Sequence, residues 1–197
     1  PLKLRVVFAS SNKHKYEEMK RLFKGANIEL LFGSEVLPKG LDVEENGKSY
    51  AENALIKARA WSEGTGMPAM SDDSGLEVEA LDWRPGIFSS RVAEDDESRI
   101  RRLLEELGCR EKRRARFVAA LSLVFPQRAQ VWITEGFCWG RIAFEPSGSF
   151  GFGYDPVFVP MGYEASFAEL GPKVKSLISH RAVAAYALSQ LLSSGGF

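Results

Sequence analysis

The segment AMSDDSGLEVEAL, residues 69–81, holds two adjacent acids, Asp72 and Asp73, between a short apolar run and a Ser-Gly pair. Residues 76–81 then alternate apolar and charged side chains, which is typical of a half-buried β-strand. Asp, Ser and Gly are common turn formers, so a turn is one interpretation of the acids. The other is a divalent metal site, because Mg²⁺ binds one or two carboxylates and takes further oxygens from water and substrate phosphates. The choice depends on what the rest of the chain places beside these acids.

Strands and helices alternate on the N-terminal side of this segment. Apolar and β-branched runs predict strands, whereas apolar residues on one face predict helices. Ser49, with Glu52 three residues later, is a capping-box pattern that indicates a helix start. The predicted elements are a buried strand over 2–10, a helix over 16–23, a strand over 28–32 and a helix over 50–61. The Asp-Asp segment therefore continues an alternating α/β pattern.

On the C-terminal side two long strands follow one another directly. The short connection between them predicts a hairpin, so we expect a mixed sheet and not a purely parallel one. The elements predicted here are a helix over 98–108 that stops at Gly108, strands over 115–125 and 130–142, a glycine-rich loop over 145–156 and a helix that starts near Ser179. The sequence thus predicts one α/β domain over residues 1–197.

Composition argues against several classes of protein. Lys and Arg number 26, as do Asp and Glu, so the formal net charge is zero and bulk attraction to nucleic acid or an anionic membrane is not expected. The basic run 110–116 lacks interleaved aromatic residues, which favours a solvated loop. No apolar run approaches the ~18 residues of a membrane span, and no secretory signal is evident. Cys109 and Cys138 lack metal-ligand spacing and fit a reducing cytoplasm.

Two segments contain groups suited to phosphate. The polar loop Ser10–Lys15 lies between a predicted strand and a predicted helix, where free N–H groups and the helix dipole attract anions. Asn53 and Lys57 are four residues apart and share one helix face. Taken singly, an ordinary turn and a solvated helix face are the commoner explanations. With His14 and His180 as the sole histidines, carboxylates are the expected metal ligands.

Two further segments suit a purine base. In GFGYDP, residues 151–156, the glycines permit close backbone approach and an aromatic ring can stack on a base. A glycine-rich bulge with core aromatics is an equally good explanation of that loop. Lys175, Ser179, His180 and Arg181 crowd donors at the start of the last helix, where a capped helix with surface charges is the alternative. RPGIFSSR, residues 84–91, predicts a structured turn without a chemical role. Together these segments supply phosphate donors, metal carboxylates, a stacking aromatic ring and donors for a base edge, which are the groups that a nucleoside triphosphate site needs.

Over nearly its whole length the sequence resembles the inosine triphosphate pyrophosphatase family, also called Ham1-like. The matching stretches, in the family's order, are ASSNKHKYEEM, EENGKSYAENALIKA, SDDSGLEVEALDWRPGIFSSR, GFGYDPVF and SHRAVA. Ser10 stands where the family usually has Thr, and His14 where it often has Gly. The resemblance implies a long curved mixed β-sheet with helices forming two lobes around a central cleft. It also implies a homodimer.

The resemblance also implies roles for residues. Carried over by position, Asp73 is the catalytic proton acceptor at the end of a strand, and Glu45 and Asp73 hold Mg²⁺, with the adjacent Glu44 as the alternative to Glu45. The implied substrate contacts are Ser10, Ser11, Asn12, Lys13, His14, Lys15, Lys57, Ser74 and Lys175, and the implied base contacts are Phe152, Gly153, Tyr154, Asp155, His180 and Arg181. Repulsion between adjacent carboxylates predicts a raised pKa for one of them without metal.

The implied reaction is hydrolysis of ITP, dITP and XTP to the monophosphate and pyrophosphate, which removes them from the nucleotide pool. Arg181 could donate to the 6-oxo group of hypoxanthine while Asp155 accepts from N1–H. Adenine presents a donor and an acceptor in the opposite places, so it would leave both partners unmatched. The alternatives are a related pyrophosphatase for other nucleotides and a nucleotide-binding sensor without turnover.

Overall fold

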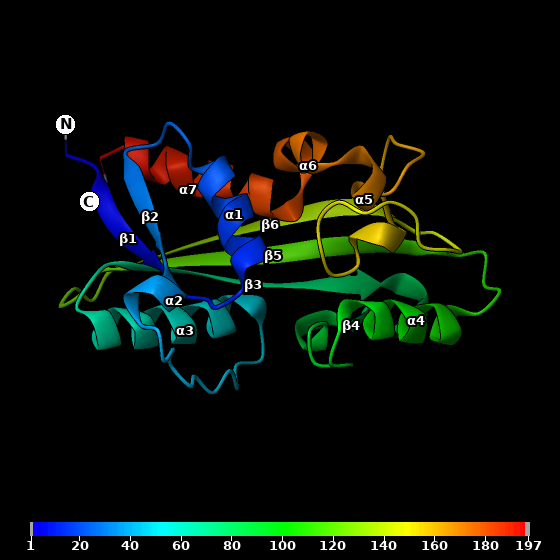
Figure 1. The fold of residues 1–197 in the computed structure, drawn as a ribbon, viewed down its shortest axis with the longest axis horizontal. Helices are drawn as coiled ribbons and strands as arrows, with labels where there is room; N and C mark the ends of the chain where they lie inside the picture. The colour runs from blue at the N-terminus through cyan, green and yellow to red at the C-terminus, as the bar shows by residue number, and fades with distance from the viewer. Residues whose placement is uncertain (1, 196–197) are drawn as a thin grey trace. The chain divides into compact units, whose positions relative to one another are not determined.

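Residues 2–195 are described by a computed structural model, in which one mixed sheet carries helices on both faces (Figure 1). The strands are β1 (Leu4–Phe8), β2 (Ile28–Phe32), β3 (Ala69–Val78), β4 (Arg84–Pro85), β5 (Arg114–Val124), β6 (Val131–Ile142) and β7 (Phe158–Pro160). The α-helices are α1 (Lys13–Leu22), α2 (Gly33–Val36), α3 (Tyr50–Thr65), α4 (Asp96–Leu107), α5 (Phe167–Leu170), α6 (Pro172–Ile178) and α7 (His180–Ser193).

The strand order is β2-β1-β3-β5-β6-β7, with β4 paired to β3. β1 runs parallel to both β2 and β3, with Val7 opposite Ala69 and Phe8 opposite Met70. β4 is antiparallel to β3, and β7 is antiparallel to β6. The α/β class with a mixed sheet, predicted from the sequence, is therefore confirmed.

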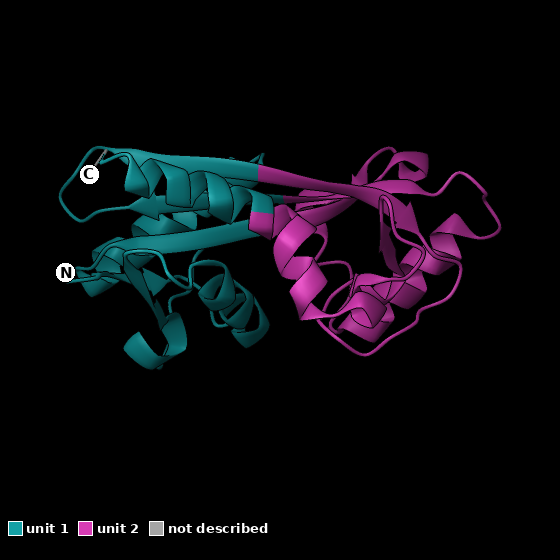
Figure 2. Ribbon diagram, turned by 90° about the horizontal axis from the view of Figure 1, so that it is seen from above, with its two compact units in different colours: residues 1–73, 119–135, 183–197 teal, residues 74–118, 136–182 magenta. Residues whose placement is uncertain are grey.

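The chain divides into two compact units, shown in different colours in Figure 2. Unit 1 comprises residues 1–73, 119–135 and 183–197, and unit 2 comprises 74–118 and 136–182. The strands β3, β5 and β6 each contribute residues to both units, and the boundary in β3 falls between Asp73 and Ser74. Asp72 and Asp73 are therefore the last two residues of the 1–73 segment of unit 1.

Unit 1 is built on the buried strand β1. Val6, Val7 and Phe8 have no exposed surface, as expected for a parallel strand covered on both faces. α1 and α7 lie on one face and α3 on the other (Figure 1). The cluster on the α1 side includes Phe8, Met19, Met70, Leu121 and Leu188. Trp61 of α3 belongs to a separate cluster with Val7, Ala9 and Ala69. The end of β1 is thus held rigidly where it passes into the 10–15 loop.

Unit 2 has its own core, in which α4 packs by an apolar stripe. Ile100, Leu103 and Leu107 recur at helical spacing and are buried. The remaining core includes Leu76, Phe117, Cys138, Phe158 and Phe167. Phe117 and Phe158 have ring centroids 4.3 Å apart. This aromatic packing supports the segment that carries the glycine-rich loop.

The two acids lie inside a strand and not at a turn or a strand end. β3 spans Ala69–Val78, so Ser74 and Gly75 continue the strand where a turn was possible. The turn interpretation and the predicted strand-end position of Asp73 are both wrong. β3 lies between β1 and β5, and pairing with neighbours on both sides outweighs the local turn preference of Asp-Ser-Gly. Rigid strand backbone thus fixes both carboxylates.

Three helices differ from the predicted bounds, among them α4, which begins at Asp96, two residues early. α1 begins at Lys13, three residues early, because the Asn12 side chain accepts a hydrogen bond from the N–H of Lys15 and so caps the helix. α3 continues to Thr65 and ends at Gly66, whose φ of 67° suits glycine. The predicted cap is confirmed, since the Ser49 hydroxyl accepts from the N–H of Glu52 at 3.1 Å. The short elements α2, α5, α6 and β7 were not predicted.

The basic run 110–116 is not a solvated loop throughout. Arg113 is buried, and its guanidinium donates to the carbonyls of Ile142 and Ala143. Arg114 and Arg116 lie on β5. Arg113 is therefore bound by backbone carbonyls, and Arg114 and Arg116 are strand residues. The charge pattern of the run did not indicate the buried position of Arg113.

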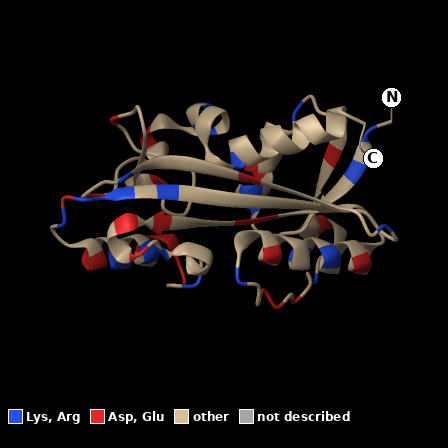
Figure 3. Cartoon of the chain, turned by 180° about the vertical axis from the view of Figure 1, so that it is seen from behind, with Lys and Arg blue, Asp and Glu red and all other residues tan. Residues whose placement is uncertain are grey.

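Charges of both signs are mixed along the helices. α3 and α4 each carry interspersed basic and acidic residues (Figure 3). No helix in residues 2–195 is both long and apolar enough to cross a membrane.

Candidate active site

The 10–15 loop forms a capped start to α1 in unit 1. The Ser10 hydroxyl accepts from the N–H of Asn12 at 3.0 Å, and the Asn12 carbonyl oxygen accepts from the N–H of Lys15 at 3.1 Å. Ser11, Lys13 and His14 are exposed. A buried strand that ends in a capped helix start presents N–H groups and a positive dipole to an anion. The local structure is therefore the one that phosphate binding requires.

Two lysines of unit 1 are held by its acidic residues. The Lys15 ammonium lies 2.8 Å from the Asp72 carboxylate, whose side chain is fully buried. The Lys57 ammonium lies 2.9 Å from the Glu45 carboxylate and donates to the Asp72 carbonyl at 3.0 Å. These contacts bring together α1, the loop before α3, α3 itself and β3. The structure thus gathers two cations and two acids from distant parts of the sequence.

Asp73 differs from Asp72 in its surroundings. It is 9% exposed, and its Oδ2 is buried without a hydrogen-bond partner in the described part of the chain. Burial raises the pKa of Asp73 to about 6, while Lys57 and Lys15 oppose the shift and the charges of Asp72 and Glu45 add to it. A raised pKa was predicted from repulsion between the adjacent acids, and the direction is confirmed. Its main cause is desolvation, because neighbouring side chains on a strand point to opposite faces.

We expect this raised pKa to appear as a pH-dependent cost in stability. The pKa of Asp73 rises from 3.8 to about 6 on folding, so the stabilising effect of its protonated form is complete below about pH 4 and lost above about pH 6. Asparagine does not ionise, so the Asp73→Asn variant does not lose this stability as the pH rises. In metal-free buffer, the free energy of unfolding of the variant minus that of wild type should therefore increase by about 1–3 kcal/mol as the pH is raised from 4 to 7.

The measurement is urea unfolding of both proteins with a chelator at several pH values. Glu77→Gln, on the same strand, serves as the control for losing one strand carboxylate. Parallel pH profiles for wild type and Asp73→Asn would contradict the assignment of the raised pKa to Asp73.

A bound Mg²⁺ needs hard oxygen donors, and unit 1 offers them in part. No group of three or more His, Cys, Asp or Glu residues within 2–195 is arranged as a metal site. Mg²⁺ commonly uses one or two protein carboxylates and completes its shell with water and phosphate, so a three-residue cluster is not required. The unpartnered Oδ2 of Asp73 fits one such ligand. Glu45 is partly buried beside Lys57, whereas Glu44 is exposed, which favours Glu45 as the second ligand.

Asn53, on the same helix face as Lys57, positions the loop that carries Glu45. It is 1% exposed, and its side-chain carbonyl accepts from the N–H of Gly47 at 2.8 Å. The solvated-face alternative for this pair of residues is therefore wrong. Asn53 thus ties the backbone at Gly47, two residues after Glu45, to α3.

In unit 2 the glycine-rich loop closes around a buried carboxylate. Asp155 accepts from the N–H of Phe152 at 3.1 Å and from the Lys175 ammonium at 2.6 Å. Gly151 has φ of 75°, and a Cβ there would lie 2.1 Å from the Asp155 carboxylate. Glycine is required at that position by both conformation and space. The loop is therefore a close-fitting backbone turn over an ion pair.

Two cations flank the Phe152 ring. The Lys175 ammonium is 4.7 Å from the ring centroid, and the Arg181 guanidinium carbon is 5.3 Å from it. Arg181 is 3% exposed and donates to the Ser74 hydroxyl at 2.6 Å. The structure thus brings Ser74, Phe152 and Arg181 into one group together with Lys175, as expected if they serve one ligand.

Two predicted base contacts have side chains in the core of unit 2. His180 is 2% exposed and stacks on Phe117 at 4.6 Å between centroids. Tyr154 is 6% exposed, and its hydroxyl donates to the carbonyl of Ser89 at 2.9 Å. Burial raises the pKa of Tyr154 to about 12, so the phenol stays protonated as a donor. The Ser89 contact gives the 84–91 turn a supporting role that the sequence did not indicate.

Comparison with known proteins gives consistent matches. A model of the Ham1 family matches residues 6–191. A dITP/XTP pyrophosphatase of Prochlorococcus marinus subsp. pastoris is 42% identical over 177 residues, covering 90% of this chain and 91% of that protein. One from Synechococcus sp. strain CC9311 is 44% identical, covering 89% of this chain and 84% of that protein. A solved HAM1 protein from Coxiella burnetii has a TM-score of 0.86 and 39% identity, covering 98% of this chain and 100% of that one.

Proposed function

The chain belongs to the Ham1 family, and on that premise we propose that it hydrolyses ITP, dITP and XTP to the monophosphate and pyrophosphate. It is a hydrolase of triphosphate anhydride bonds that removes modified purine nucleotides from the pool. The structural observation that carries the proposal is the buried Asp73 carboxylate, whose Oδ2 has no hydrogen-bond partner in residues 2–195. The charges of Lys57 and Lys15 act on this carboxylate and lower its pKa against the effect of burial. A carboxylate with a free oxygen beside two lysines is suited to act on a bound triphosphate, whereas a structural ion pair would leave no oxygen unpartnered.

We propose that unit 1 acts on the triphosphate. The N–H groups at the start of α1, with Ser10, Ser11, Asn12, Lys13 and His14, would bind phosphate oxygens, and Lys15 and Lys57 would act as point charges. Asp73 would accept the proton of the attacking water, and its pKa of about 6 lies near neutral pH, where a general base works well. Asp73 and Glu45 would hold Mg²⁺, which when bound supplies neutralising charge and a more acidic water.

We propose that unit 2 binds the base. Phe152 would stack on the purine, and Gly153 would let the backbone come close. Arg181 and Lys175 carry donors alone, so they suit a 6-oxo acceptor and disfavour the 6-amino group of adenine. Asp155 accepts hydrogen bonds from the Lys175 ammonium and from the N–H of Phe152, and so fixes the two residues that would contact the base. Asp155 is also the proposed acceptor for N1–H. Specificity would follow from unmatched donors when adenine binds.

The experiment that tests the function is a substrate panel with products separated. ITP, dITP, XTP, GTP and ATP are incubated with Mg²⁺, and pyrophosphate is distinguished from orthophosphate. We expect pyrophosphate as the first product and the highest kcat/KM for the 6-oxo substrates. Orthophosphate as the primary product would overturn the pyrophosphatase assignment, and binding of ITP without turnover would favour a sensor.

We propose that the protein is a cytoplasmic homodimer that associates through an aromatic face of unit 2. Phe137 and Trp83 are 42% and 38% exposed, and the Arg116 guanidinium lies 4.9 Å and 5.3 Å from their ring centroids. Arg114 lies 4.2 Å from the ring of Trp139. Aromatic and Arg side chains are enriched where protein surfaces pair. Both cysteines are free thiols, which suits the cytoplasm.

For the dimer, the expected result is a light-scattering mass of twice the 21.9 kDa chain. Phe137→Glu should reduce it to the mass of one chain, because a charge placed among stacked aromatics cannot be buried cheaply. Phe144→Glu, a change at another exposed Phe of unit 2, is the matched control and should remain dimeric. A monomeric wild type, or a dimeric Phe137→Glu, would contradict this face as the interface.

A further inference from the structure

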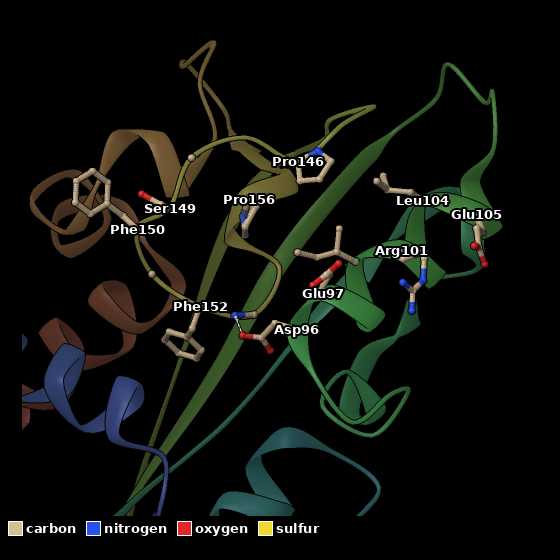
Figure 4. A pocket seen from close by; sticks show the side chains of 14 residues that line it. Asp96, Glu97, Arg101, Leu104, Glu105, Pro146, Ser149, Phe150, Phe152 and Pro156 are labelled. Carbon is tan, nitrogen blue, oxygen red and sulfur yellow. Dashed lines mark hydrogen bonds between the residues drawn. The ribbon is translucent and has the colours of Figure 1, made fainter.

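A hollow of about 710 Å³ separates the glycine-rich loop of unit 2 from α4 (Figure 4). Its apolar lining includes Ile100 and Leu104 of α4 and Pro146 and Pro156 of the loop. Residues 145–151 are exposed. Side-chain packing therefore does not fill the space between this loop and α4, and the position of the loop depends on polar contacts.

Asp96, the first residue of α4, makes such a contact. Its Oδ2 accepts from the N–H of Gly153 at 2.7 Å, the dashed line in Figure 4. Its Oδ1 accepts from Arg99 at 2.7 Å, and Arg99 also donates to the carbonyls of Ala93 and Glu94. The carboxylate is thus held by its own helix turn before it reaches the loop. A hydrogen bond to a charged acceptor is among the stronger kinds.

The contact falls beside the proposed base-binding groups. Gly153 follows Phe152 directly, and the Phe152 ring points away from α4 (Figure 4). The next residue, Tyr154, is tied by its hydroxyl to the Ser89 carbonyl. The loop is therefore held from behind at two successive residues, while its other side carries Phe152 and the Asp155–Lys175 pair.

We infer that Asp96 is a positioning residue for purine recognition, which fixes the Phe152 ring by holding the N–H of Gly153. The inference rests on the proposed function, since it concerns the same base site. Loss of the Asp96 carboxylate would let the loop move into the hollow and would weaken binding of the base. The triphosphate groups of unit 1 would keep their affinity, because the hydrogen bonds of the Asp96 carboxylate, to Gly153 and Arg99, lie within unit 2.

The test is Asp96→Ala with Glu97→Ala as the matched control, since Glu97 is the next acid of α4 and also lines the hollow. Expected for Asp96→Ala are a ~10-fold higher KM for ITP, a kcat within about two-fold of wild type, and a ~10-fold weaker inhibition by IMP. Inhibition by pyrophosphate should not change. Amide hydrogen exchange at Gly153 should become faster in this variant and stay slow in Glu97→Ala.

Two outcomes would overturn the inference: an unchanged KM and IMP inhibition in Asp96→Ala, or an equal weakening of IMP and pyrophosphate. If Asp96→Ala does not fold, Asp96→Asn carries the same comparison, because Gly153 and Arg99 donate to different carboxylate oxygens and the amide nitrogen that replaces one of them cannot accept. A wild type that releases no pyrophosphate from ITP would instead defeat the proposed function. A wild type that does so, with no effect in either Asp96 variant, would defeat the positioning role alone.

Discussion

Asp73→Asn is expected to lower the rate of pyrophosphate release from ITP by at least ~10³-fold while the protein stays folded. Asparagine keeps the shape of the side chain but can neither take a proton from water nor neutralise a divalent cation. General base catalysis alone contributes about 10²–10⁴-fold, and the loss of a metal ligand adds to it. The substitution removes a buried charge that desolvation disfavours, so folding should not suffer.

The rate is measured at saturating Mg²⁺ with a pyrophosphate readout, alongside thermal unfolding of each variant. Glu77→Gln is the matched control, because Glu77 lies on the same strand but pairs with Arg116 in unit 2. Its activity should be close to that of wild type. Activity of Asp73→Asn within a few-fold of wild type would show that Asp73 is neither base nor essential ligand. The expected gain in metal-free stability makes this variant informative in two independent assays.

Local patterns predicted the elements whose signals are local. The apolar run of β1, the Ser49 cap of α3 and the Gly108 stop of α4 are each where the sequence places them. β3 shows the limit of this approach, since Asp-Ser-Gly favours a turn by itself. Its strand conformation depends on the neighbouring strands β1 and β5, which lie elsewhere in the sequence.

For the candidate site the sequence proposed a set of residues but could not give the contacts among them. Resemblance named Lys175 and Asp155, and yet their ion pair required the structure. The tie between Asp96 and Gly153 joins residues 57 positions apart and has no sequence signal, because an acid in the first helical turn is normally explained by the helix dipole. Such tertiary contacts decide which side chains face a ligand and which, like Tyr154, support the loop.

Arg181→Ala is expected to lower kcat/KM for ITP by ~10–100-fold and that for ATP much less. Arg carries donors alone and is always charged, so at a base edge it favours an acceptor and disfavours another donor. Arg181 is 3% exposed, held by the Ser74 hydroxyl and set 5.3 Å from the Phe152 ring, so its guanidinium is fixed in place. Losing a hydrogen bond from a charged donor of ~1.5–3 kcal/mol corresponds to the expected range.

The measurement is kcat/KM for ITP, GTP and ATP on wild type, Arg181→Ala and Arg181→Lys, with pyrophosphate as the readout. Lysine keeps the charge but presents a single point donor without the planar fork, so it should restore only part of the ITP rate. GTP shares the 6-oxo group and should fall together with ITP, whereas ATP should fall little or rise slightly. If ITP and ATP instead drop by the same factor, Arg181 acts on phosphate or on the fold of unit 2. In that case discrimination against the 6-amino group must come from Lys175 or Asp155, the two charged residues proposed above to bind the base beside Arg181.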